Sequence, residues 1–237
     1  MKEIISSGLE AMGLAGRVPE DAPAQLARYG EMLLEKNQVM NLTAITDPDK
    51  VAQLHMLDCA ALLNCAQFEG KTLIDVGTGA GFPGLPLKIL VPSLDVTLLD
   101  SLNKRVDWLS QVCDSLGLEG VTALHARAEE QAQVKGFRDS FDFAAARAVA
   151  DLRLLAELCL PYVKVGGHFL SMKSVESDEE LEGAAHAIKL LGGRVRAQVD
   201  YAIPGCGVTH RVVVIEKVAP TLKGYPRRWA KIQKDPL

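Results

Sequence analysis

The sequence predicts an α/β fold built on a mostly parallel, Rossmann-like sheet of seven strands. From Thr72 onward, short apolar runs alternate with helical patterns, which is typical of parallel strands whose crossover helices cover both faces of a sheet. The last two runs, 194–202 and 209–217, are separated only by a short Gly-rich loop at 204–207. Because so short a connection can join antiparallel strands only, we expect the sheet to end in an antiparallel hairpin.

Three parts are expected along the chain. Residues 1–70 are predicted to form a helical N-terminal extension, with helices over about 21–38 and 47–62, where apolar side chains recur at helical spacing. Residues 71–220 contain the alternating pattern and are predicted to form the sheet domain. Residues 221–237 are predicted to be a basic C-terminal tail.

Within the sheet domain, each strand is expected to lead into a helix. The five strands before the hairpin are predicted at 72–77, 95–100, 121–125, 141–147 and 166–173. The helices are predicted at 83–91, 103–117, 127–134, 150–164 and 177–191. In an open sheet of this kind, ligands bind at the carboxyl ends of the strands, so these ends carry the candidate site residues.

Composition excludes several classes of protein. Of the 237 residues, 48% are apolar, which is enough for a sizeable core, but no apolar run approaches the ~18 residues of a membrane span. The five cysteines are odd in number and form no CxxC pair, which favours reduced thiols over disulfides or a zinc site. We therefore expect a cytoplasmic monomer that has no membrane or metal partner.

A glycine-rich loop follows the first predicted strand. The stretch contains Asp75, Gly77, Gly79, Gly81, Phe82 and Gly84. Glycines between a strand and a helix let bare backbone approach a ligand. The spacing is GxGxG rather than the dinucleotide pattern GxGxxG, because position 82 is Phe. This form suits a nucleoside that lacks a pyrophosphate.

A second acidic signal comes 23 residues after Gly77, where the next strand is predicted to end in Asp100. A carboxylate at that point can accept hydrogen bonds from ribose hydroxyls. Together, the two signals predict a site for S-adenosylmethionine, with Asp75, Gly77, Gly79, Gly81 and Asp100 as contacts. A parallel sheet with a final antiparallel hairpin is also the usual plan of class I methyltransferases. The alternative is a tight strand–helix turn and a carboxylate that only caps a helix.

Other strand ends supply further candidates. Ala128 and Glu129 follow the third strand and are placed to hold an adenine ring. Arg147 and Lys173 end the fourth and fifth strands, where they are suited to fixing RNA phosphates or, for Arg147, to contacting the cofactor. His55 lies three residues before Asp58 on one helix face. The alternative for Arg147 and Lys173 is that they are only solvated charges at the strand ends. The alternative for His55 is that it only packs in the core or caps a helix. Arg147, Lys173 and His55 are kept as positioning candidates, and no catalytic base is assigned.

The acceptor atom is constrained by what the sequence lacks. No Pro-Cys pair supplies the thiolate of cytosine C5 transfer, and Arg147-Ala148-Val149 stands where amine methyltransferases carry an Asn/Asp-Pro-Pro-aromatic loop. A ring nitrogen such as guanine N7 has an exposed lone pair and needs no base, so positioning and desolvation can supply most of the rate.

Several motifs together resemble one family. They are Asn41-Leu42-Thr43, His55-Met56-Leu57-Asp58-Cys59, the loop 75–87, Leu98–Arg105, Arg127–Glu130, Ala146–Ala150 and Lys223–Arg228. The chain is similar to the RsmG family, also called glucose-inhibited division protein B, of small-subunit rRNA guanine-N7 methyltransferases. The resemblance implies cofactor contacts at Gly77, Phe82, Ala128, Glu129 and Arg147, and a single target, guanine 527 of bacterial 16S rRNA. The chain departs from the family at Ser174 and Leu222, where glycine and proline are common.

The C-terminal tail suggests a contact with RNA. From Lys223 onward, the chain contains five cationic side chains and one Asp. The tail therefore has a net charge of +4, and the rest of the chain has a net charge of −8. Tyr225 and Trp229 are suited to stacking on bases. The predicted RNA-binding residues are Arg105, Lys173, Arg227 and Arg228, and the partner is 16S rRNA or the small-subunit particle. Removal of the tail is expected to weaken RNA binding and spare cofactor affinity. The alternative is a solvated, frayed terminus.

Two other classes of function remain open. One is a methyltransferase that acts on a small molecule or on another RNA. The other is a regulatory module that binds a nucleotide without catalysis.

Overall fold

The computed structural model describes residues 1–237 and contains one seven-stranded sheet, in the order β3-β2-β1-β4-β5-β7-β6. The strands are β1 (Thr72–Val76), β2 (Asp95–Asp100), β3 (Val121–His125), β4 (Phe141–Arg147), β5 (Val163–Ser174), β6 (Gly193–Ile203) and β7 (Val208–Lys217). Strands β1 to β5 pair in parallel, whereas β7 is antiparallel to both β5 and β6. The predicted α/β fold with a final antiparallel hairpin is therefore confirmed.

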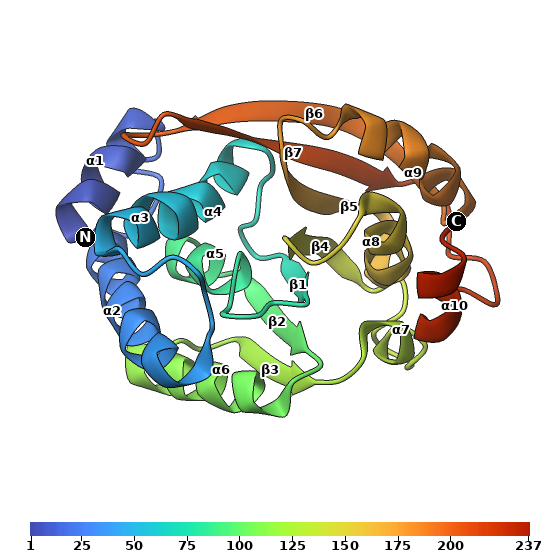
Figure 1. The fold of residues 1–237 in the computed structure, drawn as a ribbon, viewed down its shortest axis with the longest axis horizontal. Helices are drawn as coiled ribbons and strands as arrows, with labels where there is room; N and C mark the ends of the chain where they lie inside the picture. The colour runs from blue at the N-terminus through green and yellow to red at the C-terminus, as the bar shows by residue number, and fades with distance from the viewer.

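Helices precede and separate the strands (Figure 1). The N-terminal part holds α1 (Lys2–Ala11), α2 (Ala22–Met40), α3 (Pro48–Val51), the π-helical turn η1 (Ala52–Leu57), α4 (Asp58–Ala60) and the 3-10 turn η2 (Ala61–Asn64). The sheet part holds α5 (Gly84–Leu90), α6 (Asn103–Leu116), α7 (Ala128–Gln131), α8 (Leu152–Cys159), the 3-10 turn η3 (Leu160–Tyr162) and α9 (Asp178–Leu190), and α10 (Trp229–Lys234) follows the sheet. The helix predicted over 47–62 is thus a succession of helical turns of different pitch.

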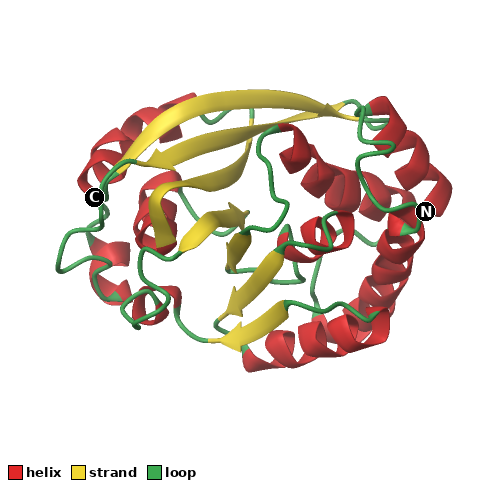
Figure 2. Ribbon diagram, turned by 180° about the vertical axis from the view of Figure 1, so that it is seen from behind, coloured by secondary structure: helices red, strands yellow, loops and turns green.

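Helices cover both faces of the sheet (Figures 1 and 2), and an apolar core lies on each face. One core joins the N-terminal helices, α5 and α6 to one face, and the other joins α8, α9 and α10 to the opposite face. The N-terminal helices share the first core with the sheet and do not enclose a core of their own. No helix combines the length and the apolar character that crossing a membrane would need.

The turn from β1 into α5 is held by the buried carboxylate of Asp75. Its Oδ2 accepts hydrogen bonds from the hydroxyl of Thr78 (2.7 Å) and from the backbone N–H of Gly84 (2.8 Å), the first residue of α5. A third anchor comes from Tyr29 of α2, whose hydroxyl donates to the carbonyl of Ala80. The loop is therefore fixed on its inner side by side chains of the core.

The order of the strands opens a crevice next to β1. The chain runs from β1 outward to β2 and β3, then returns to the other side of β1 through β4. Helices that leave neighbouring strands in opposite directions separate at such a switch point, and ligands of open α/β sheets bind there. The carboxyl ends of β1 and β4 meet at this point, so the glycine loop faces Arg147.

Candidate active site

Three neighbouring cavities lie along the carboxyl ends of the parallel strands. The β3-side cavity, of about 240 Å³, is lined by the ends of β1, β2 and β3 and includes Gly77, Asp100, Ala128 and Glu129. The glycine-loop cavity, of about 440 Å³, shares Gly77 and Asp100 with it and adds Gly79, Phe82, Arg105 and Arg147, among others. The β5-side cavity, of about 530 Å³, lies beyond Arg147.

Asp100 lines both the β3-side and the glycine-loop cavities. Its Oδ2 accepts from the N–H of Gly79 (2.9 Å), and its Oδ1 accepts from the N–H of Leu102 at the start of α6 (2.9 Å). Arg105 places its guanidinium 3.4 Å from Oδ2. The carboxylate thus ties the glycine loop to β2 and holds the residue that precedes α6, while it also borders both cavities.

The glycines of the loop differ in what they face. Gly77 and Gly79 adopt φ values of +71° and +60°, and both line the glycine-loop cavity. A Cβ on Gly79 would meet no atom closer than 3.9 Å, so its backbone borders open space. A Cβ on Gly81 would lie 2.6 Å from the hydroxyl of Tyr29, so this glycine permits close packing against α2. A Cβ on Gly77 would lie 3.0 Å from the side chain of Val149, so of the two only Gly79 leaves open space in which a ligand could approach the backbone.

Two of the predicted cofactor contacts lie behind the cavities rather than in them. Asp75 is fully buried and borders none of the three cavities, and burial raises the pKa of its carboxyl group to about 6. Gly81 is likewise absent from the three linings. The structure therefore gives Asp75 and Gly81 a role in shaping the loop.

Arg147 stands between the glycine-loop and the β5-side cavities. Its guanidinium carbon lies 4.7 Å from the ring centroid of Phe82, and the ring of His55 stacks on Phe82 at 4.5 Å. Its Nη1 donates to Asp58 Oδ2 (2.9 Å) and to the carbonyl of Leu54 (3.1 Å), and its Nη2 donates to His55 Nδ1 (2.9 Å). These contacts fix the guanidinium at the edge of the glycine-loop cavity, which Phe82 and Arg147 both line.

The hydrogen bonds of His55 define its protonation. Because arginine is only a donor, Nδ1 of His55 accepts from Arg147 and Nε2 carries the proton toward Thr43 Oγ1, 2.8 Å away. Burial, together with the charge of Arg147, lowers the pKa of His55 to about 3. His55 is therefore neutral with both nitrogens engaged, which suits a residue that positions Arg147 and leaves no lone pair for a base.

Asp58 accepts hydrogen bonds from residues that are far apart in the sequence. Its Oδ1 accepts from the hydroxyl of Tyr201 on β6 (2.7 Å) and from Nδ1 of His210 on β7 (2.8 Å). Burial opposes the charge of Asp58, but the bond from His210, the charge of Arg147 and the bond from Tyr201 hold its pKa below the ordinary value. The bond to Asp58 in turn raises the pKa of His210. The network therefore links the N-terminal helices, β4 and the hairpin.

The β5-side cavity is bordered by this network and by β5. Its lining includes His55, Asp58, Arg147, Met172, Lys173 and His210. The ammonium of Lys173 pairs with Glu180 and donates to the carbonyl of Ala150 (2.8 Å), so it holds the loop after β4. In that loop Ala148 adopts a φ of +54°, a strained value for a residue with a side chain, and it borders both this cavity and the glycine-loop cavity.

The predicted RNA-binding cations have different surroundings. Arg105 is partly exposed at the rim of the glycine-loop cavity, and Arg228 is exposed. Arg227 is committed to a bidentate pair with the buried Glu157, and Lys173 is committed to Glu180. No group of three or more His, Cys, Asp or Glu side chains is arranged to hold a metal ion.

Sequence reasoning missed several residues that line or support the cavities. Tyr201 and His210 reach Asp58 across more than 140 residues, and Trp229 enters the β3-side cavity from α10. No local motif marks these residues, because their role comes from contacts made only in the folded chain. Val149 lies two residues after the predicted Arg147, and its place just beyond the ligand end of β4 was the one signal available for it.

Comparison with solved structures shows the fold. A SAM-dependent methyltransferase from Aquifex aeolicus superposes with a TM-score of 0.56 at 21% identity, covering 75% of this chain and 97% of that chain. TrmN from Thermus thermophilus superposes with a TM-score of 0.53 at 23% identity, covering 68% of this chain and 48% of that chain, so this chain spans about half of it. The fold is therefore that of class I methyltransferases.

Sequence comparison shows the family. The family model GidB, described as rRNA small subunit methyltransferase G, matches residues 22–204. A protein of Alkaliphilus metalliredigens named ribosomal RNA small subunit methyltransferase G is 45% identical over 240 residues, covering 100% of this chain and 98% of that protein. One of the same name from Lachnoclostridium phytofermentans is 48% identical over 214 residues, covering 90% and 88%. The resemblance in the motifs is thus confirmed, and this chain belongs to the rRNA small subunit methyltransferase G family.

Proposed function

We propose that this protein transfers a methyl group from S-adenosylmethionine to N7 of guanine 527 in bacterial 16S rRNA, acting as a cytoplasmic monomer. The names of its relatives support an action on small-subunit rRNA. One observation carries the chemistry: a fixed, charged Arg147 divides a nucleoside-sized cleft from a second cavity, and His55 beside it has no free lone pair.

The cofactor would lie in the β3-side and glycine-loop cavities. S-adenosylmethionine, when bound, supplies an electrophilic methyl group on a sulfonium. Asp100 borders both cavities and offers carboxylate oxygens to ribose hydroxyls, while Ala128 and Glu129 border the far end, where an adenine ring would lie. The backbone of Gly77 borders both cavities, and that of Gly79 borders the glycine-loop cavity.

The guanine would enter the β5-side cavity. His55, Arg147 and Ala148 border both this cavity and the glycine-loop cavity, so they stand at the boundary between substrate and cofactor. N7 carries a lone pair and no proton, so the chain has no proton to remove. Its task is to hold the base against the boundary and to exclude water, which is the work that a rigid Arg147 network can do.

The test is to map the product. The purified protein is incubated with methyl-labelled S-adenosylmethionine and small-subunit particles, and RNA is then cleaved chemically at 7-methylguanine. We expect one cleavage site, at guanine 527, in particles from a strain that lacks the enzyme. Label on another base or another atom would contradict the proposal. Label on a metabolite alone would favour a small-molecule enzyme, and cofactor binding with no transfer would favour a regulatory module.

A further inference from the structure

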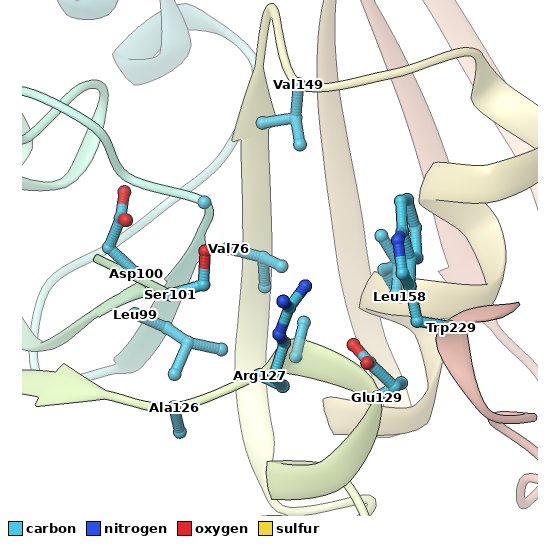
Figure 3. A pocket seen from close by; sticks show the side chains of 12 residues that line it. Val76, Leu99, Asp100, Ser101, Ala126, Arg127, Glu129, Val149, Leu158 and Trp229 are labelled. Carbon is cyan, nitrogen blue, oxygen red and sulfur yellow. The ribbon is translucent and has the colours of Figure 1, made fainter. Parts of the chain in front are cut away.

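Trp229 lies on the wall of the β3-side cavity, although it belongs to the C-terminal tail. Figure 3 shows its indole beside Leu158 on one side of the cavity, with Asp100 and Ser101 on the opposite side. Glu129 lies between the two sides, at the end where α7 begins. The wall facing the proposed ribose contact is therefore supplied by a residue more than a hundred positions further along the chain.

A buried ion pair fixes the segment just before Trp229. The guanidinium of Arg227 donates from Nε to Glu157 Oε1 (2.8 Å) and from Nη2 to Glu157 Oε2 (2.6 Å). The backbone N–H of Arg227 donates to the same carboxylate at 2.8 Å. Glu157 lies on α8 and is fully buried. A bidentate pair with this additional bond sets the position and the orientation of the backbone that leads into α10.

A second anchor holds the chain just before that pair. Arg138 donates to the carbonyls of Tyr225 (2.7 Å) and Thr221 (3.0 Å), and Gln133 donates to the carbonyl of Pro226 (2.9 Å). On α10, Ile232 is fully buried in the core beneath α8. The tail is thus docked along most of its length, and the indole is held in place by contacts that do not involve a ligand.

We propose that the indole of Trp229 forms the wall against which the adenine ring of S-adenosylmethionine binds, so that segment 221–237 is part of the cofactor site. This inference rests on the proposed function. The cavity joins apolar side chains, among them Leu99 and Leu158, to the carboxylate of Glu129. Flat apolar surfaces with a polar group at one edge suit a purine, and an indole offers the largest such surface. The tail was predicted from its charge to serve RNA alone.

The experiment compares two ligands with two variants. S-adenosylhomocysteine keeps the whole cofactor frame, and methylthioadenosine keeps the nucleoside but lacks the amino-acid part. We expect Trp229→Ala to raise the Kd of both ligands by a similar factor, about 5-fold to 150-fold, the range found when an aromatic side chain beside a base is removed. Trp229→Phe keeps an aromatic ring and is expected to lose less. Calorimetric Kd values that match those of the parent protein would overturn the inference.

Control variants distinguish the loss of a contact between Trp229 and the ligand from a loss of folded structure. Lys231→Ala changes an exposed residue of the same helix and should leave both Kd values unchanged. If Trp229→Ala unfolds the tail, fluorescence still tests the inference, because Trp108 and Trp229 are the two tryptophans and Trp108 is buried in the core. We expect S-adenosylhomocysteine to change the emission of Trp108→Phe, which retains Trp229, and to leave that of Trp229→Phe unchanged. The reverse pattern would overturn the inference.

The two proposals fail in different ways. If the parent protein binds neither ligand, the proposed methyltransferase function is contradicted. If the parent binds both ligands and Trp229→Ala binds them equally well, only the role of Trp229 is contradicted.

Discussion

Arg147 and Asp58 form a buried ion pair, with Nη1 of the arginine 2.9 Å from Oδ2 of the aspartate. The pair joins the end of β4 to the N-terminal helices; Arg147 lines both the glycine-loop and the β5-side cavities, whereas Asp58 lines the β5-side cavity. His55, three residues before Asp58, contacts the same guanidinium. The helical extension therefore supplies all three hydrogen-bond acceptors of the Arg147 guanidinium, the Leu54 carbonyl, His55 and Asp58, which makes it part of the candidate site.

Loss of the aspartate should destabilise the fold. In Asp58→Ala the charge of Arg147 stays buried without its partner, and breaking such a pair costs about 3–5 kcal/mol. The matched control is Asp178→Ala, which removes a largely exposed partner of Arg211 and should cost less than about 1 kcal/mol. Urea denaturation measures both. Equal losses in the two variants would contradict the importance given to the buried pair.

The pair between His210 and Asp58 should make stability depend on pH. The bond to Asp58 raises the pKa of His210 in the folded state. The stabilisation of the fold by protonated His210 is therefore complete below the unfolded-state pKa of 6.5, and it is lost as the pH rises through the folded-state pKa. The pKa of Asp58 is lowered, so its contribution is lost only as the pH falls through a value below 3.8. The gap in Tm between the parent and His210→Gln should therefore be larger at pH 6 than at pH 9. A gap that stays constant or widens at pH 9 would show that the charged pair does not form.

His55 should position Arg147 without titrating during catalysis. Its pKa of about 3 keeps it neutral across the working range. We expect His55→Ala to lower kcat by roughly 10-fold to 100-fold, the cost of misplacing a positioning group, while the shape of the pH–rate profile stays the same. A profile that loses an inflection between pH 6 and 7 in the variant would instead identify His55 as a titrating catalyst.

Local patterns predicted the parts of the site that lie close together in the sequence. The glycine loop follows β1, Asp100 ends β2, and Glu129 lies at the start of α7 shortly after β3, and the carboxyl ends of parallel strands meet at one edge. The prediction that Arg227 binds RNA rests on its charge alone. Its partner Glu157 lies 70 residues away, and a sequence does not show which charges form ion pairs. Trp229 was assigned to stacking on RNA bases for the same reason: nothing near it in the chain marks the cavity that it borders.

Two neighbouring arginines should therefore behave differently. Arg227→Ala leaves the buried Glu157 unpaired and should lower stability by about 3–5 kcal/mol. Arg228→Ala changes an exposed side chain, so Tm should stay the same while RNA affinity at low salt falls. Thermal melts and filter binding at two salt concentrations measure these effects. Matching losses of stability in both variants would refute this division of roles.

Gly79 and Gly117 provide a matched test of the glycine loop. Both adopt left-handed φ values, +60° and +62°, and a Cβ on either would meet no atom within 3.8 Å. Alanine should therefore cost each site a similar backbone strain, about 1–2 kcal/mol. Only Gly79 borders the glycine-loop cavity, whereas Gly117 ends α6 and borders none of the three cavities. We expect Gly79→Ala to weaken S-adenosylhomocysteine binding at least tenfold and Gly117→Ala to leave the Kd unchanged, as measured by calorimetry on folded protein. If both variants keep the parental Kd, the cofactor does not approach the backbone at Gly79, and its contacts must lie elsewhere along the cleft.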